Sequence, residues 1–235
     1  MALAAFVIHS RPYRETSQLV EVFTQEQGRQ SLVARGSRQP RSPLKGLLQP
    51  FVPLRLTFGG KGELKTLYSA EATGPAIRLT GTALYSGLYL NELIHYLLEI
   101  QTPFEEVFEV YETTLRKLAA GSALEPCLRN FEFYMLNVLG YGVDFTQDAE
   151  TGAVVCAQGW YAYRPETGFV ALVRPEPGAY RGDWLHDLAE LRLESAEVLA
   201  AAKRFSRTAL APYLEGRVLK SRALFIKGKR GSPSE

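Results

Sequence analysis

The spacing of apolar residues changes near Thr80, and this change constrains the fold more than any other feature of the sequence. Before it, short runs of β-branched and aromatic residues are separated by turn residues, which is the pattern of antiparallel strands. After it, apolar residues recur every three or four positions, the period of a helix. The 235 residues therefore predict an α+β chain with a β domain over residues 1–79 and a helical domain over residues 80–235.

The first domain is predicted to contain five short antiparallel strands. Gly-containing segments at 25–28 and 59–62 are typical of hairpin loops between them. A sheet of this size must protect its edges, and closure into a small barrel of the SH3 or OB kind does so within about 70 residues. The predicted strands cover residues 5–8, 18–23, 29–34, 53–58 and 64–69.

Three helices are predicted at the start of the second domain, and together they are expected to form a bundle. The first covers residues 84–98 and is apolar on most sides, which indicates a buried helix. The second is predicted to begin with Thr102 as its N-cap, Pro103 at the first helical position and Glu105 closing a capping box. The third runs over about residues 124–139.

A stretch rich in Gly and aromatic residues interrupts the helical pattern at about residues 143–180. Two alternating runs within it, 160–163 and 168–173, are joined by turn residues and predict an inserted β-hairpin. Helical periodicity then returns up to about residue 213. The chain is predicted to end in a disordered basic tail that starts at Lys227.

The net charge of +2 hides an uneven distribution along the chain. Residues 1–80 carry 11 basic and 5 acidic side chains, residues 81–200 carry 7 and 18, and residues 201–235 carry 9 and 2. An acidic middle between two basic ends favours an anionic partner, such as nucleic acid, at the ends.

Cysteine and histidine usage excludes several classes of protein. Cys127 and Cys156 cannot form a disulfide framework and do not form a C-x-x-C pair, so a reducing compartment is expected. The three histidines lie in different predicted elements, and no nucleophile, phosphate-loop or metal-ligand motif is present. We therefore expect no catalytic residues, no cofactor and no metal. No uncharged stretch is long enough to cross a bilayer, which predicts a cytoplasmic protein without a membrane partner.

The strongest functional signal is electrostatic. The 36 residues between Glu26 and Glu63 contain no acid and carry seven basic side chains, four of them in a Gly-, Pro- and Ser-rich segment at 35–45. A flexible basic loop on a small barrel can follow a phosphate backbone, although a basic loop that serves only solubility is an equally good interpretation of one isolated run. The basic C-terminal segment shifts the balance toward nucleic acid.

The predicted loop after the first strand adds an aromatic residue between two arginines. A base could stack on Tyr13, with packing as the alternative role of that ring. No residue pattern indicates readout of base edges, so contacts without sequence preference are expected. The residues predicted to bind nucleic acid are Arg11, Tyr13, Arg14, Arg35, Arg38, Arg41, Lys45, Lys61, Lys203, Arg204, Arg207, Lys220 and Arg222.

Several short motifs follow one another in a fixed order along about 220 residues. They are His9-Ser10-Arg11-Pro12-Tyr13, Leu32-Val33-Ala34-Arg35-Gly36, Leu48-Gln49-Pro50-Phe51, Asn91-Glu92-Leu93, Leu139-Gly140-Tyr141-Gly142 and Leu219-Lys220-Ser221-Arg222. In these motifs the chain resembles the RecO family of bacterial recombination mediators and DNA repair proteins. The resemblance implies an N-terminal OB-fold barrel, an all-α helical domain and a zinc-finger-like hairpin module inserted in that domain.

The resemblance also implies a function and partners. Members of this family bind single- and double-stranded DNA, anneal complementary strands without ATP, and act with RecR to load RecA on DNA. They also bind the acidic C-terminal tail of single-stranded DNA-binding protein, and the position that matches their tail-binding arginine is Arg129. A guanidinium can donate two hydrogen bonds to a terminal carboxylate, while neighbouring Leu128 or Phe131 could line a pocket for an aromatic side chain of the tail.

The sequence departs from the family pattern in the inserted module. Many members carry four cysteines with zinc-ligand spacing there, whereas this chain has only Cys156, so a metal-free module held by aromatic packing is expected. The leading hypothesis is a non-enzymatic DNA-binding and annealing protein located in the cytoplasm with the nucleoid. The alternatives are a scaffold that docks protein partners through its acidic part and an OB-type RNA-binding protein.

Overall fold

The computed structural model describes residues 2–214 and 216–230, with side chains up to residue 225 apart from residue 215. The chain divides into two compact units, each described by itself below. Unit 1 comprises Met1–Leu124 and Val218–Glu235, and unit 2 comprises Glu125–Arg217. Unit 1 thus combines the β region with helices from both ends of the remaining sequence, and the predicted domain boundary at residue 79 stays a prediction.

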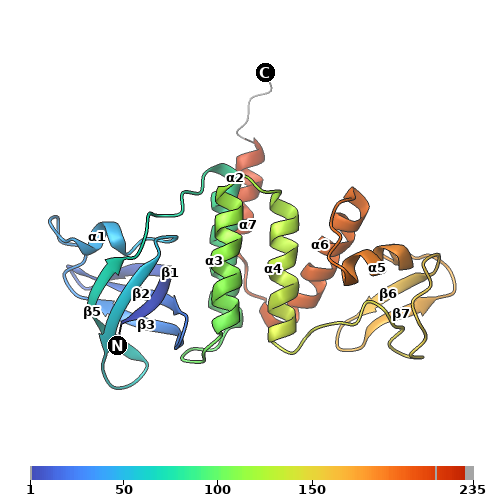
Figure 1. Cartoon of the computed structure of the whole chain (residues 1–235), viewed down its shortest axis with the longest axis horizontal. Coiled ribbons are helices and arrows are strands. Elements are labelled where there is room, and N and C mark those ends of the chain that lie inside the picture. The colour runs from blue at the N-terminus through green and yellow to red at the C-terminus, as the bar shows by residue number, and fades with distance from the viewer. Residues whose placement is uncertain (1, 215, 231–235) are drawn as a thin grey trace. The chain divides into compact units, whose positions relative to one another are not determined.

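Unit 1 contains the predicted barrel, shown in blue to teal in Figure 1. The strands close in the order β1-β2-β3-β5-β4, with β3 and β5 parallel and the other pairs antiparallel. This order and the parallel closure confirm the OB alternative. The strands are β1 (Leu3–Tyr13), β2 (Ser17–Thr24), β3 (Gly28–Ala34), β4 (Leu54–Gly59) and β5 (Leu64–Ala72), and a short helix α1 (Leu44–Leu47) follows β3.

The first strand is longer than predicted. Arg11 and Tyr13 lie in β1 and not in a loop, because the pairing with β2 continues through Tyr13 opposite Ser17. Pro12 is tolerated there because β1 pairs with β4 only near its start, so beyond that point one edge of β1 needs no hydrogen-bond donors.

Besides α1, unit 1 contains three longer helices among the described residues. They are α2 (Gly81–Leu97), α3 (Glu105–Ala119) and α7 (Lys220–Arg230), and α2 contacts both of the others. The disordered tail predicted from Lys227 is therefore wrong for residues 227–230, which belong to α7. The remainder of that tail, 231–235, lies outside the described residues.

A mixed aromatic and polar core joins the barrel to these helices. The Phe6 ring lies 5.4 Å from that of Tyr111 on α3, in an edge-to-face arrangement. The Tyr111 hydroxyl donates to Oδ1 of Asn91 at 2.6 Å, and Nδ2 of Asn91 donates to the Ile8 carbonyl at 3.3 Å. Burial raises the pKa of Tyr111 above its ordinary value. The buried amide of Asn91 on α2 thus connects the barrel with α3.

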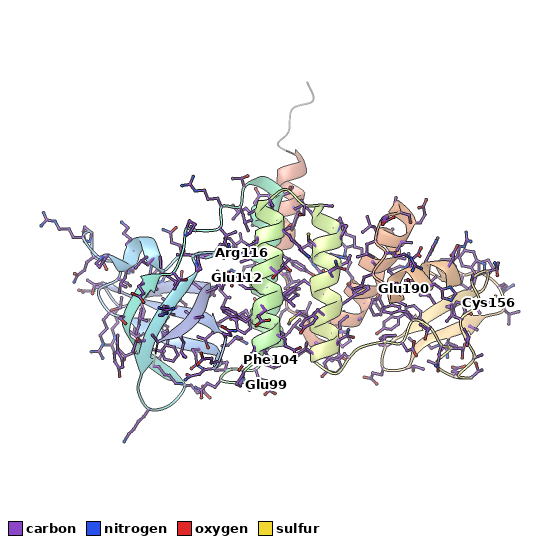
Figure 2. The ribbon with its side chains drawn as sticks, in the orientation of Figure 1. Glu99, Phe104, Glu112, Arg116, Cys156 and Glu190 are labelled. Carbon is purple, nitrogen blue, oxygen red and sulfur yellow. The ribbon has the colours of Figure 1, made fainter. Side chains whose placement is uncertain are left out.

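The predicted capping box of α3 is wrong. The helix begins at Glu105 with Phe104 as its N-cap, and the Thr102 hydroxyl donates to Glu99 instead of capping the helix. Phe104 and Glu99 are labelled near the start of α3 in Figure 2. The preceding segment is instead bonded to the barrel, where the backbone N–H of Gln101 donates to the carbonyl of Arg29 at 2.9 Å.

Unit 2 contains the remaining elements. The predicted third helix is α4 (Leu124–Val138), which begins at the boundary of the unit, and the predicted hairpin is the pair β6 (Trp160–Arg164) and β7 (Gly168–Leu172). The other elements are β8 (Tyr180–Arg181), α5 (Gly182–Ala189), α6 (Ala196–Leu210) and the 3-10 turn η1 (Pro212–Leu214). Ser195 caps α6 by accepting from the N–H of Val198.

Aromatic side chains form the centre of the hairpin module, as predicted. The Phe169 ring is fully buried and lies 5.1 Å from the Tyr180 ring and 5.3 Å from that of Tyr163. Phe205 on α6 closes the cluster, with its ring 4.9 Å from that of Tyr163. Within residues 2–214 and 216–230, no group of three His, Cys, Asp or Glu side chains is placed to hold a metal ion. No helix in the described part of the chain is long and apolar enough to cross a membrane.

Candidate nucleic-acid interface

An open pocket of about 700 Å³ lies on the outer surface of the barrel. It is formed where the β1–β2 turn, the end of β3 and β5 come together, and Tyr13, Arg14 and Arg35 line it. The guanidinium of Arg14 lies over the Tyr13 ring, 5.1 Å from its centroid, in a cation–π contact. Three residues predicted to bind nucleic acid are thus brought together at one site.

The loop after β3 is tied to the β1–β2 turn next to this pocket. The backbone N–H of Arg38 donates to the Thr16 carbonyl at 2.8 Å, and its side chain donates to the carbonyls of Arg14 and Glu15. The buried Ser37 hydroxyl donates to the carbonyl of Ala34 at 2.9 Å. These bonds hold a segment that the sequence predicted to be flexible, and they make Arg38 a residue that positions the loop.

The other predicted cations of the barrel are exposed. Arg11 lies in β1 and Arg41 in the loop after β3. Lys45 lies in α1, and Lys61 lies in the loop between β4 and β5. None of these four side chains has an ion pair to a carboxylate among the described residues, so they are available to an anionic ligand.

Arg29 shows that the sequence overestimates the free charge of this region. It belongs to the acid-free stretch but is 7% exposed. Its Nε donates to Glu21 at 2.6 Å, and its Nη1 donates to the Leu98 carbonyl at 2.6 Å. Nδ1 of His95 lies 2.7 Å from Glu21. Burial works to raise the pKa of Glu21, but the hydrogen bond from His95 and the charge of Arg29 hold this pKa below its ordinary value.

The predicted C-terminal cations are divided between the two units. In unit 2, Lys203 is half-buried with Nζ 2.5 Å from Glu125, and the Arg204 guanidinium lies 4.2 Å from the Tyr180 ring centroid. These two side chains therefore do not share the free outer face of α6 that the sequence predicted, whereas Arg207 is exposed. In unit 1, Lys220 and Arg222 are exposed in the first turn of α7. Their roles in binding stay predictions.

The three residues predicted to receive the partner tail lie together on α4 and are buried. Arg129 is 4% exposed, and its Nη2 donates to Glu132 at 2.8 Å. Its Nε is also buried and has no hydrogen-bond partner within the described part of the chain. Leu128 and Phe131 are 6% and 0% exposed. The tail site stays a prediction, and a ligand there would have to reach a buried guanidinium.

The barrel also presents an aromatic side chain that the sequence interpretation did not assign to the interface. Tyr68 on β5 is 65% exposed and is the most exposed aromatic side chain among the described residues. The signal was present in the sequence, because the alternation of β5 places Tyr68 on the face opposite to that of buried Leu67.

A closed OB-type barrel with an open basic and aromatic pocket, combined with helices and a hairpin module, defines a class of two-part OB-fold proteins. The family model described as "Recombination protein O N terminal" matches residues 1–76, and the one described as "Recombination protein O C terminal" matches residues 78–223. The chain belongs to the RecO family of DNA repair proteins.

Curated relatives match over nearly the whole chain. Proteins named DNA repair protein RecO from Shigella flexneri serotype 5b, Escherichia coli O139:H28 and Escherichia fergusonii are each 51% identical to it over 222 residues. The match covers 94% of this chain and 92% of each relative.

Proposed function

We propose that the protein is a non-enzymatic recombination mediator that binds single- and double-stranded DNA and anneals complementary strands without ATP. The observation that carries this proposal is the pocket on the barrel, where Tyr13, Arg14 and Arg35 converge beside an anchored basic loop. Annealing requires that two strands be brought together with their phosphates neutralised and their bases free. Exposed cations around an aromatic pocket meet both requirements.

The test is a salt titration of binding to an oligonucleotide. If about five phosphates of a single strand are neutralised, the affinity falls with salt at a log–log slope of about −3.5. Replacing Arg35, Arg38 and Arg41 with Glu should abolish binding and ATP-independent annealing. An affinity that does not change between low and high salt would contradict the proposal, and equal competition by a matched RNA strand would favour an RNA-binding protein.

The proposal includes protein partners. In it, the protein works with RecR to load RecA on DNA coated with single-stranded DNA-binding protein, in the cytoplasm and on the nucleoid. The acidic C-terminal tail of single-stranded DNA-binding protein would bind at Arg129. The buried Nε of this side chain supports the assignment, because it lacks a partner among the described residues and can donate to a carboxylate oxygen.

The tail site is tested with two peptides of that acidic tail, one with a free C-terminal carboxylate and one amidated. The free carboxylate should bind and the amidated peptide should not. Arg129→Lys should weaken binding because an ammonium cannot form the two parallel bonds of a guanidinium. Thermal unfolding of the variant is the control, since Arg129 also pairs with buried Glu132. Equal affinity for both peptides would argue against a terminal carboxylate as the ligand.

A further inference from the structure

Tyr68 is an aromatic side chain on the outer surface of the barrel that packs only in part. Its neighbour Leu67 is buried in the barrel core, whereas the Tyr68 side chain is 65% exposed. A regular strand would place an exposed aromatic beside the side chains of adjacent strands. Here β4 pairs with β5 through an irregular register between Thr57 and Phe58, which leaves Tyr68 without a paired residue on β4.

The Tyr68 ring lies against a glycine of the neighbouring strand. A Cβ atom built on Gly59 would lie 3.0 Å from both Cε2 and the hydroxyl of Tyr68. The ring therefore occupies the space that a side chain at this position of β4 would fill. Contact with backbone restrains the ring on one side, and the high exposure leaves the other side to solvent.

This ring borders the pocket already described. Gly59 pairs with Thr66, and Thr66 lines the pocket together with Tyr13 and Arg35. The Tyr68 ring lies against Gly59, the residue opposite Thr66, and is therefore beside Thr66 on the outer face of the sheet. The exposed cation Lys61 lies in the loop that joins the two strands. The aromatic surface of the pocket thus continues along β5 beside positive charge.

We infer that Tyr68 stacks on an unpaired base of single-stranded DNA and extends the binding site beyond Tyr13. This inference rests on the proposed function and adds a residue that selects the single strand. The bases of a duplex are covered by their neighbours in the stack, so only a single strand offers a free face to the ring. The cations near the pocket hold the phosphates, and stacking on the ring tolerates any base sequence.

The experiment compares the full-length protein with Tyr68→Ala and Tyr68→Phe. Affinities are measured for a mixed-sequence single-stranded oligonucleotide and for its duplex. Tyr68→Ala should weaken binding of the single strand by at least about fivefold and leave duplex binding unchanged. Tyr68→Phe keeps the stacking surface and should bind like the wild type. The salt slope should be the same for all three proteins, because the ring carries no charge.

Two controls separate stacking from other effects. Tyr141→Ala removes another exposed tyrosine ring, in unit 2, and should not change either affinity. The second control is Tyr68→Trp, which adds an indole at the proposed stacking position. Adding single strand should quench tryptophan fluorescence more in this variant than in the wild type, whose only tryptophans are Trp160 and Trp184.

The outcomes are distinct. Equal losses for single strand and duplex, or no loss for Tyr68→Ala, would overturn the role of Tyr68 while leaving the proposed function intact as long as the wild type binds DNA. Failure of the wild type to bind any DNA would instead overturn the proposed function, and the inference with it.

Discussion

Arginines from the same stretch of the sequence differ in burial and in pairing, as Arg29 and Arg35 illustrate. Both lie in the acid-free stretch of the sequence, but Arg29 is buried against Glu21 whereas Arg35 is exposed at the pocket. Charge counting could not separate the two residues, because the partner of Arg29 comes from another strand and His95 of the same cluster comes from α2. Pairing of this kind depends on the tertiary fold.

The Glu21 cluster makes the stability of unit 1 depend on pH. Because the pKa of Glu21 is lowered in the folded state, its contribution to stability is present above the ordinary carboxyl pKa and is lost as the pH falls through the folded value. Glu21→Gln should reduce the free energy of unfolding by roughly 3 kcal/mol at pH 7, since Arg29 stays buried without its anionic partner. The difference between variant and wild type should shrink as the pH falls below about 4.

The measurement is urea unfolding of both proteins at several pH values. Glu71→Gln is the matched control, because Glu71 forms only an exposed pair with Arg55 at 3.8 Å. A constant difference between Glu21→Gln and wild type over the whole pH range would contradict the assignment of the effect to this carboxylate.

At the scale of elements, sequence patterns predicted the strands and helices whose formation depends on neighbouring residues. The alternation of five short runs predicted the strands of the barrel, and the spacing of apolar residues predicted the ends of α2 and α4 to within a few residues. The capping pattern at Thr102 failed because the backbone next to it bonds to β3, at the contact between Gln101 and Arg29. The sequence could not show this competition, since the two segments are more than 70 residues apart.

The close approach of the segment around Thr102 to the start of β3 also favours glycine at position 28. Gly28 has φ +64°, and a Cβ atom there would lie 1.8 Å from the carbonyl oxygen of Thr102. We expect Gly28→Ala to cost about 3 kcal/mol or more, from backbone strain and from overlap with a backbone atom that cannot move aside cheaply. Gly121→Ala is the control, because Gly121 has φ +81° but open space around it, and about 1 kcal/mol of strain is expected. Thermal unfolding should rank the two variants in this order, and equal costs would contradict the steric explanation.

One carboxylate of α2 caps the start of α7. Glu92 on α2 accepts hydrogen bonds from the backbone N–H groups of Lys220 and Ser221 and so caps α7 from another helix. Glu92→Ala should remove about 1 to 2 kcal/mol of local stability. Hydrogen–deuterium exchange should become faster in the first turns of α7 and stay unchanged in the barrel. Glu99→Ala, at an exposed carboxylate after α2, should leave exchange in α7 unaltered.

At the scale of the whole molecule, charge follows the two compact units. Unit 1 has 18 basic and 12 acidic residues, and unit 2 has 9 and 13, so the net charges are +6 and −4. The basic residues of α6 belong to the acidic unit, so the basic C-terminal segment of the sequence is not one continuous basic surface of a single unit. Its α6 part neutralises nearby acids such as Glu125, and its α7 part adds to the charge of the barrel unit.

This division predicts unequal effects of two charge-matched double variants on DNA binding. Arg35→Gln with Arg41→Gln removes two exposed cations, and Lys203→Gln with Arg204→Gln removes two that already have partners. The barrel pair should reduce the salt slope for single-stranded DNA by about 1.4, since each lost phosphate contact contributes about 0.7. The α6 pair should change it by less than half as much, because its cations would have to leave Glu125 and Tyr180 to reach a phosphate.

Binding isotherms between low and high salt measure both slopes, and thermal unfolding confirms that the variants are folded. Equal slopes for the two double variants would show that DNA displaces the α6 cations from their partners.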